Sequence, residues 1–318
     1  MIRWTVRILV ALVLLGAAGL VALVALGQTP GIPRAEAEAK HAVAPSELMT
    51  FGDGTRVHFR DRGPRSAPAI VLVPGFTDSL LSFEAVATSL AESHRVVSLD
   101  LPGHGLTGPI PSGDYSQDNL ARTVLELTRL LGIERFAIAG NSMGGAVALR
   151  ASLLAPGRVT KVMLLCAGGI TDPANPEPPM VVRLLRLPLV GPWLATATPR
   201  TQIEGYLARV VADPAKLDPA FVQAYSDLVL VEGGREARQK IMSVPFGEFL
   251  LDGRLGEVRV PVLVLWGAKD PILSMRMADV FARDIPQAEK LVFDDVGHMP
   301  QLEAPERTAQ ALAAFMAR

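Results

Sequence analysis

The chain has 318 residues, with 31 basic and 32 acidic side chains and a formal net charge of -1. This length suits one large α/β domain with an insertion, or two smaller domains. The balanced charge leaves no electrostatic footprint for nucleic acid, so we expect no nucleic-acid partner. The five histidines do not follow the spacing of metal ligands, so we expect no metal and no other cofactor. The single cysteine, Cys166, lies in an apolar run and is predicted to be buried.

The first 27 residues predict a membrane segment. No charged or polar residue occurs from Ile8 to Leu26, and Arg3 and Arg7 precede this run. Its length is near the lower limit for a helix that spans a bilayer, and the basic flank favours an N-terminus in the cytoplasm. We therefore expect a single-pass anchor at residues 1–27, with the rest of the chain periplasmic or extracellular. The alternative is a signal peptide cleaved near residues 25–27, which would give a secreted protein.

Residues 28–45 contain three prolines and the charged stretch 34–40. This composition predicts a solvated linker between the membrane and the folded domain.

Apolar runs then alternate with helical patterns. Strands are predicted at 48–51 and 55–60, joined by Gly52-Asp53-Gly54, and at 69–73, 95–99, 136–139, 159–166, 261–266 and 290–293. Helices are predicted at 79–92, 117–131, 142–154, 274–284 and 305–316. This order indicates an α/β fold with a doubly wound, mostly parallel sheet and an antiparallel hairpin at one edge.

The alternation stops between about residues 170 and 255, where a proline-rich stretch leads into apolar, helical sequence. We interpret residues 171–255 as a helical cap that divides a core of residues 46–170 and 256–318. Such a cap can cover a pocket at the carboxyl ends of the strands.

Gly140-Asn141-Ser142-Met143-Gly144 is the most informative motif. It lies between a predicted strand and a predicted helix, which is the setting of a nucleophile elbow. A serine hydroxyl needs a base and a group that orients the base. His298 is the candidate base and Asp270 the candidate acid, and both follow predicted strands. Three other carboxylates stay possible as the acid: Asp100, Asp294 and Asp295.

These motifs resemble those of the α/β-hydrolases, a superfamily of esterases, lipases, carbon–carbon bond hydrolases, epoxide hydrolases and haloperoxidases. The order Ser142, Asp270, His298 matches that family, and so does the turn Asp100-Leu101-Pro102-Gly103-His104-Gly105. The segment Val73-Pro74-Gly75-Phe76 occupies the place of the family's oxyanion loop. The resemblance implies that the backbone N–H groups of Phe76 and Met143 stabilise the oxyanion. Pro74 stands where the family usually has histidine, which changes the support of that loop.

Serine at the elbow disfavours dehalogenases and epoxide hydrolases, which the resemblance associates with aspartate. We expect a serine hydrolase that cleaves small or acyl-chain hydrophobic carboxylic esters through an acyl-enzyme. Three alternatives stay open: a carbon–carbon bond hydrolase acting on vinylogous diketone acids, a perhydrolase with the same three residues, and a catalytically inactive binding module. Acyl length and oligomeric state are not given by the sequence.

Overall fold

The structure is a computed structural model. It describes residues 29–172, 199–244 and 250–318, together with positions 4, 7, 16, 19, 174, 183, 184, 187 and 191. The predicted membrane segment and part of the predicted cap therefore lie outside the described residues. Within the described part, no helix has the length and apolar character needed to cross a bilayer.

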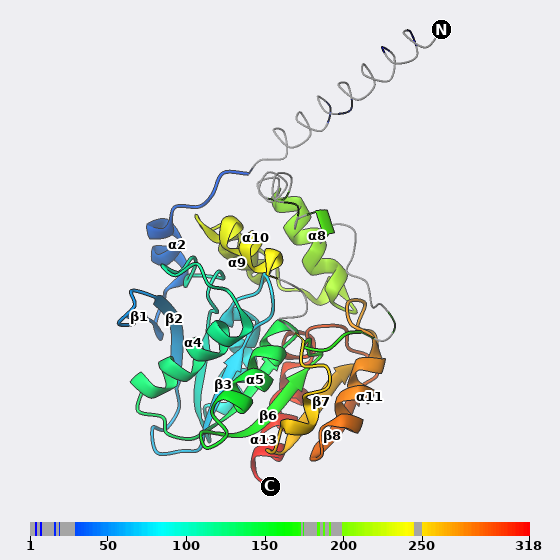
Figure 1. The fold of residues 1–318 in the computed structure, drawn as a ribbon. Coiled ribbons are helices and arrows are strands. Elements are labelled where there is room, and N and C mark those ends of the chain that lie inside the picture. The colour runs from blue at the N-terminus through cyan, green and yellow to red at the C-terminus, as the bar shows by residue number, and fades with distance from the viewer. Residues whose placement is uncertain are drawn as a thin grey trace.

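One eight-stranded sheet forms the centre of the described ranges, in the order β1-β2-β4-β3-β5-β6-β7-β8 (Figure 1). The strands are β1 (Ser46–Thr50), β2 (Arg56–Arg62), β3 (Ala69–Val73), β4 (Arg95–Leu99), β5 (Phe136–Asn141), β6 (Val159–Leu165), β7 (Val262–Gly267) and β8 (Ala288–Phe293). Strand β2 pairs antiparallel with both β1 and β4, and the other pairings are parallel. The predicted doubly wound, mostly parallel sheet with an antiparallel hairpin at its edge is confirmed.

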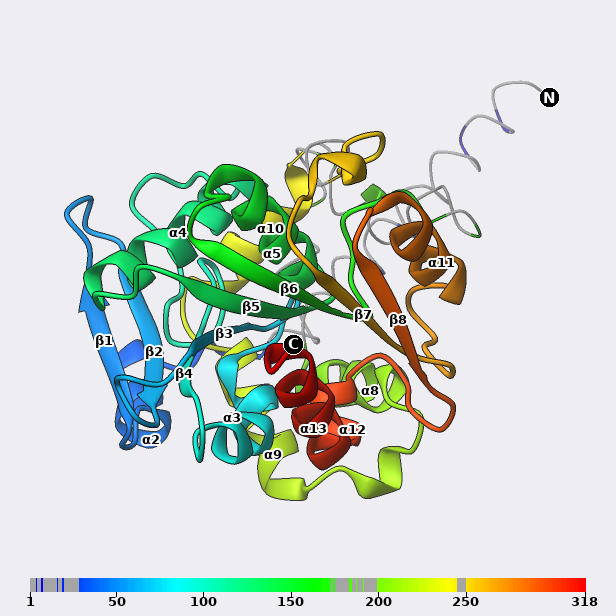
Figure 2. The same cartoon turned by 90° about the horizontal axis from the view of Figure 1, so that it is seen from below.

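The sheet is buried because helices cover both of its faces (Figure 2). Side chains alternate along a strand, so Val71 and Val73 of β3 join one apolar cluster while Ile70 and Leu72 join the other. The first cluster includes residues of α4 (Gln117–Leu130), α5 (Met143–Leu154) and α11 (Met275–Asp284). The second includes residues of α3 (Glu84–Leu90) and α13 (Pro305–Met316). Strands apolar on both faces are what this arrangement requires.

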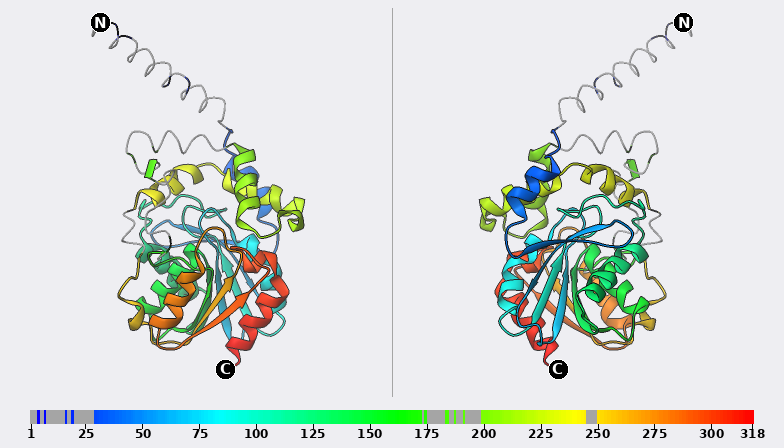
Figure 3. Two further views of the ribbon diagram at one scale, coloured as in Figure 1. Left: turned by 90° about the vertical axis from the view of Figure 1, so that its right-hand side faces the viewer. Right: turned by 90° about the vertical axis from the view of Figure 1, so that its left-hand side faces the viewer.

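Three helices lie beyond one end of the sheet, as Figures 1 and 3 show. They are α8 (Arg200–Val210), α9 (Pro219–Val229) and α10 (Gly234–Ser243). Ile203 and Leu207 of α8 share an apolar cluster with Tyr225 and Val229 of α9. These helices fall within the range predicted to form a cap, and we call them the cap helices. The described ranges also contain four short helical segments: η1 (Leu80–Phe83), η2 (Pro214–Lys216), η4 (Leu255–Glu257) and α12 (Pro300–Glu303).

The structure differs from the predicted solvated linker at residues 34–41, which form helix α2 (Arg34–His41). Ala37 on this helix is buried, and Lys40 Nζ lies 2.6 Å from Asp227 Oδ2 on α9. Just before the helix, Ile32 N donates to Leu230 O at 2.9 Å. This charged stretch is therefore an amphipathic helix bound to the cap helices, and its composition alone did not reveal the partner.

Candidate active site

Ser142 stands on a sharp turn between β5 and α5. Its φ of 53° and ψ of -119° are strained for a residue with a side chain. The flanking glycines explain how the turn is accommodated: a Cβ on Gly140 would lie 2.1 Å from Gly144 O, and one on Gly144 would lie 2.2 Å from Val73 O. Only glycine fits these two positions. The G-x-S-x-G motif therefore has the strand–turn–helix geometry of a nucleophile elbow.

The side chains of Asp270 and His298 are hydrogen-bonded to each other. Asp270 follows β7, His298 follows β8, and His298 Nδ1 lies 2.8 Å from Asp270 Oδ2. The other oxygen of Asp270 accepts from the backbone N–H groups of Ile272 at 2.8 Å and Leu273 at 3.0 Å. The carboxylate is thus held on both sides, and it can fix the orientation of the imidazole.

Two other candidate acids are engaged elsewhere. Asp100 lies 2.7 Å from His58 Nδ1 and also accepts from the backbone N–H groups of Leu80 and Leu106. Asp295 pairs with Arg307 at 2.7 Å. Of the candidate carboxylates, Asp270 is the one bonded to the imidazole of His298.

Asn141 links the serine turn to the histidine loop. Its Nδ2 donates to Leu165 O at 3.0 Å and to His298 O at 2.9 Å. The residue before Ser142 is therefore hydrogen-bonded to His298 itself. No hydrogen bond joins the hydroxyl of Ser142 to the imidazole among the described residues, which include both. Such contacts are often long in unliganded enzymes and shorten in complexes.

The residues proposed for the oxyanion hole lie beside Ser142. A Cβ on Gly75 would be 3.2 Å from Ser142 Cβ, so the loop that carries Phe76 passes close to the serine. In the described part of the chain, the N–H groups of Phe76 and Met143 donate to no other backbone carbonyl. Both are thus free to donate to a ligand. Since these donors are backbone groups, Pro74 in place of histidine leaves them intact.

Glu303 is a residue that the sequence did not single out. Its carboxylate accepts from the backbone N–H groups of Gly297 at 2.9 Å and Met299 at 3.0 Å, on either side of His298. It also accepts from Ala212 N, just after α8, at 2.6 Å. His298 N donates to Val210 O at 2.9 Å. The histidine loop is therefore tied to the end of α8. Glu303 is the last residue of the short helix α12 and lies four residues after its N-cap, Met299. This is not the serine- or threonine-based pattern of a capping box, so no signal in the local sequence indicated its role.

The cap helices contact the oxyanion loop. Phe76 and Met143 pack against a buried cluster that includes Ala237 and Ile241 of α10. The hydroxyl of Tyr225 on α9 lies 3.1 Å from Thr77 Oγ1. Among the described residues, apolar cap side chains therefore lie next to the two residues proposed for the oxyanion hole.

Burial shifts several pKa values around this loop. Burial raises the pKa of Asp78 to about 7, although Ser82 Oγ and Ser79 N donate to its carboxylate. Burial lowers the pKa of His104 to about 4, and the Nδ1 of its ring lies 3.0 Å from Pro102 O. His104 is thus a neutral, buried residue of the turn.

Cys166 lies close to Asp270 and His298. It is buried directly after β6, with Gly267 N 3.3 Å from its Sγ. One ligand atom each from Cys166, Asp270 and His298 lies within 4.8 Å of the others. Burial raises the pKa of the thiol well above its usual value, which disfavours the thiolate that a metal requires. Asp270 and His298 are also already bonded to each other, so this set fits a metal poorly.

The model of the family described as alpha/beta hydrolase fold matches residues 68–305. This range covers β3 to α12 and includes all the residues proposed for the site. The chain belongs to the α/β hydrolase fold family. Its sheet order and the placement of Ser142, Asp270 and His298 after β5, β7 and β8 are properties of an α/β hydrolase.

Known proteins resemble this α/β hydrolase over most of its length. A Pseudomonas putida protein named dihydrolipoyllysine-residue acetyltransferase component of acetoin cleaving system is 32% identical over 287 residues, covering 89% of this chain and 72% of the relative. The solved 2-hydroxy-6-oxo-6-phenylhexa-2,4-dienoate hydrolase of Rhodococcus sp. strain RHA1 is 26% identical, with a TM-score of 0.72, covering 86% of this chain and 100% of that one. A solved structure described as a membrane phospholipase A is 24% identical, with a TM-score of 0.72, and the match covers 98% of both chains. The last of these shows the fold alone.

Proposed function

We propose that this hydrolase cleaves carboxylic esters by nucleophilic catalysis at Ser142. The hydrogen bond between Asp270 and His298 carries the proposal, because it orients an imidazole beside the serine turn. In the proposed reaction, Ser142 Oγ attacks the ester carbonyl while His298 Nε2 takes its proton. The imidazolium then protonates the leaving alcohol. Water activated by the same nitrogen finally hydrolyses the acyl-enzyme.

The backbone N–H groups of Phe76 and Met143 are proposed to stabilise the negative charge that develops on the carbonyl oxygen. Donors of this kind act most strongly where water is excluded. The buried cluster with Ala237 and Ile241 provides an apolar setting next to both residues. It favours substrates with a hydrophobic acyl group.

A second candidate is hydrolysis of a carbon–carbon bond in a vinylogous diketone acid. The similarity to the Rhodococcus hydrolase, whose name denotes such a dienoate, favours it. The apolar cluster beside Phe76 and Met143 supports the ester reaction instead, because it suits a hydrophobic acyl group. Both reactions use a nucleophile, a base and an oxyanion site, so a direct substrate comparison is needed.

The deciding experiment compares p-nitrophenyl butyrate and octanoate with a vinylogous diketone acid, using the wild type and Ser142→Ala. We expect turnover of the esters that is lost in Ser142→Ala. Turnover of the diketone acid alone would reject the ester proposal. No turnover, together with no labelling of Ser142 by a fluorophosphonate, would indicate an inactive binding module.

We also propose that residues 1–27 anchor the enzyme in a membrane, with the catalytic domain outside the cytoplasm. The uncharged run from Ile8 to Leu26 and the preceding arginines support this. The measurement is the intact mass of the protein in the membrane fraction, combined with protease digestion of spheroplasts. Loss of the segment ahead of Gln28 would indicate a cleaved signal peptide. Protection of the domain from protease in intact spheroplasts would contradict the orientation.

A further inference from the structure

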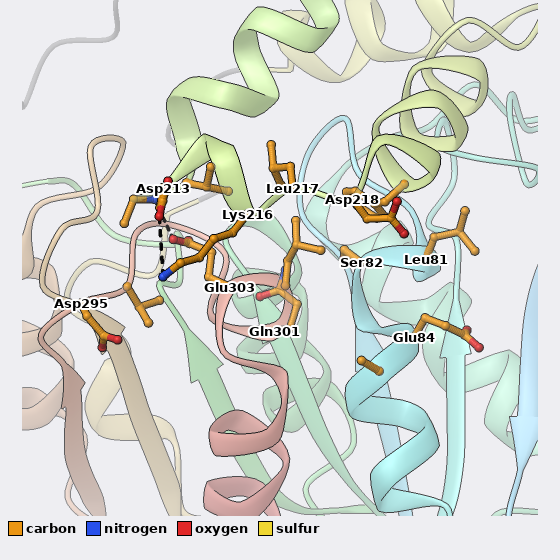
Figure 4. Close-up of a pocket in the computed structure, with 16 residues that line it drawn as sticks. Leu81, Ser82, Glu84, Asp213, Lys216, Leu217, Asp218, Asp295, Gln301 and Glu303 are labelled. Carbon is orange, nitrogen blue, oxygen red and sulfur yellow. Dashed lines mark hydrogen bonds and ion pairs between the residues drawn. The ribbon is translucent and has the colours of Figure 1, made fainter.

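A cavity of about 410 Å³ lies between the cap helices and the core, and none of Ser142, Asp270 and His298 lines it. Its walls come from the start of α3, from the segment that joins α8 to α9, and from the loop and helix that follow β8 (Figure 4). The volume is in the range of small-molecule sites. This cavity is separate from the residues proposed for ester hydrolysis.

Its chemistry is apolar with an excess of negative charge. Leu217, Phe221 and Leu302 are among the apolar residues that line it. The described lining also contains five carboxylates, those of Glu84, Asp213, Asp218, Asp295 and Glu303, and one lysine, Lys216. Lys216 lies 3.6 Å from Asp213, as the dashed line in Figure 4 shows.

Two of these carboxylates have no cationic partner among the described residues. Asp218 accepts from Ala220 N at the start of α9, and Glu303 accepts only from backbone N–H groups. A ligand carboxylate would be repelled here, whereas an organic cation would be attracted.

A buried amide supplies a second, independent observation. Gln301 is fully buried, and neither its Oε1 nor its Nε2 has a hydrogen-bond partner in the described part of the chain. It lines the cavity, and Figure 4 shows it between Glu303 and Ser82, beneath Leu217. A buried amide of this kind is costly unless something completes its hydrogen bonds. The carbonyl oxygen suits the N–H group of an ammonium ligand.

Hydrogen bonds from a residue of the cavity wall connect the cavity to the proposed active site. Glu303 lines it and holds the N–H groups of Gly297 and Met299, which flank His298. Val296 and Ala212 line it as well. A positive charge placed beside Glu303 would disfavour the imidazolium that His298 must form during the reaction.

We propose that this cavity is a regulatory site for a small amphiphile with an apolar body and an ammonium group, and that occupation slows the reaction at Ser142. The binding part of the inference is independent of the proposed ester hydrolysis. The kinetic part rests on it. The two are therefore tested separately.

Binding is tested by calorimetry on the Ser142→Ala variant of the full chain with n-octylammonium, and with octanoate for comparison. We expect a Kd of about 1 mM or tighter for octylammonium, and no binding of octanoate at this cavity. In the same background, Ala85→Trp should abolish binding, because Ala85 is exposed and lines the cavity. The matched control is Ser89→Trp, which is exposed on the same helix and outside the lining.

Asp218→Asn removes one charge and keeps a side chain that can cap α9, so it should weaken octylammonium binding several-fold. The inference is overturned if octylammonium does not bind, if Ala85→Trp leaves its affinity unchanged, or if octanoate binds equally well in a manner that Ala85→Trp abolishes.

For the kinetic part, saturating octylammonium should lower the kcat of the wild type for p-nitrophenyl acetate about fivefold. The single variant Ala85→Trp, which keeps Ser142, should show no such decrease. If octylammonium binds but leaves kcat unchanged, the cavity is a ligand site without a regulatory role. An inactive wild type would reject the ester proposal, while the calorimetry would still decide the site.

Discussion

The side chain of Asn141 donates a hydrogen bond to the backbone carbonyl oxygen of His298 at 2.9 Å. The residue before the proposed nucleophile thus fixes the segment that carries the proposed base. The same Nδ2 donates to Leu165 O, at the end of β6. One amide group therefore joins the end of β5 to the end of β6 and to the loop after β8.

Replacing Asn141 by alanine should lower kcat for p-nitrophenyl butyrate about tenfold or more. Small displacements of catalytic groups have effects of this size, and two buried carbonyl groups would lose a donor. Steady-state kinetics with the purified variant is the measurement. Asn119→Ala is the control, because Asn119 Nδ2 donates to the exposed Asp114 O and not to Leu165 or His298. Equal kcat values for the two variants would show that Asn141 does not position His298.

Asp270→Asn should lower kcat about a thousandfold or more while the fold is retained. The variant keeps an acceptor for the N–H groups of Ile272 and Leu273 but holds the imidazole in the wrong tautomer. Circular dichroism and ester hydrolysis at pH 7 are the measurements. Asp295→Asn is the matched control, since Asp295 pairs with Arg307 on the surface. If Asp295→Asn lost activity and Asp270→Asn kept it, the acid would be misassigned.

Glu303→Gln should reduce both kcat and stability. The carboxylate accepts from Gly297, Met299 and Ala212, and an amide nitrogen in place of one oxygen would face N–H groups. A loss of about 1 kcal/mol in the free energy of unfolding is expected for such a half-buried mismatch. Denaturant unfolding and ester kinetics test this, with the exposed Glu306→Gln as control. Wild-type kcat in Glu303→Gln would show that the histidine loop does not depend on this residue.

Asp78→Asn should stabilise the protein at alkaline pH. Burial raises the pKa of Asp78 from 3.8 to about 7, so between these values the folded state binds a proton that the unfolded state has released. Stability contributed by this group therefore falls as pH rises from about 4 to about 7. The variant has no carboxyl group to ionise at this position. The difference in free energy of unfolding between Asp78→Asn and the wild type should therefore increase from about pH 4 to about pH 7 and stay constant above it, at about 4 kcal/mol at most.

Thermal unfolding of both proteins at pH 4, 5, 6, 7 and 8 measures this difference. His104, with its pKa lowered to about 4, titrates in both proteins and cancels in the comparison. An advantage of Asp78→Asn that is constant over the pH range would contradict the raised pKa of Asp78.

The strands were predictable because burial on both faces demands continuous apolar runs. The runs at 69–73 and 95–99 coincide with β3 and β4, and the run at 136–139 lies within β5. Helix α2 is rich in alanine, glutamate and lysine, which favour helices, so its helical form could have been predicted. Its attachment through Lys40 to Asp227 could not, because Asp227 lies far away in the sequence.

Contacts between residues that are distant in the sequence also limited the prediction of the candidate site. Ser142, His298 and Asp270 were each indicated by sequence motifs, and the hydrogen bond to His298 supports Asp270 over the other candidate carboxylates. Asn141 and Glu303 act through backbone groups of other segments, and no local pattern records which carbonyl or N–H group a side chain reaches after folding.

The attachment of α2 to the cap helices has a mechanical consequence. Ile32 is hydrogen-bonded to Leu230 and Lys40 to Asp227, while Glu38 pairs with Arg56 of β2. The chain entering from Thr29 is therefore attached to the cap helices before it reaches the sheet. A pull transmitted along this chain would act first on the cap, through Thr29 and Ile32, and cap helix α9 carries Tyr225, whose hydroxyl contacts Thr77 of the oxyanion loop. Tension on the N-terminal side would therefore act on the helices that contact the oxyanion loop.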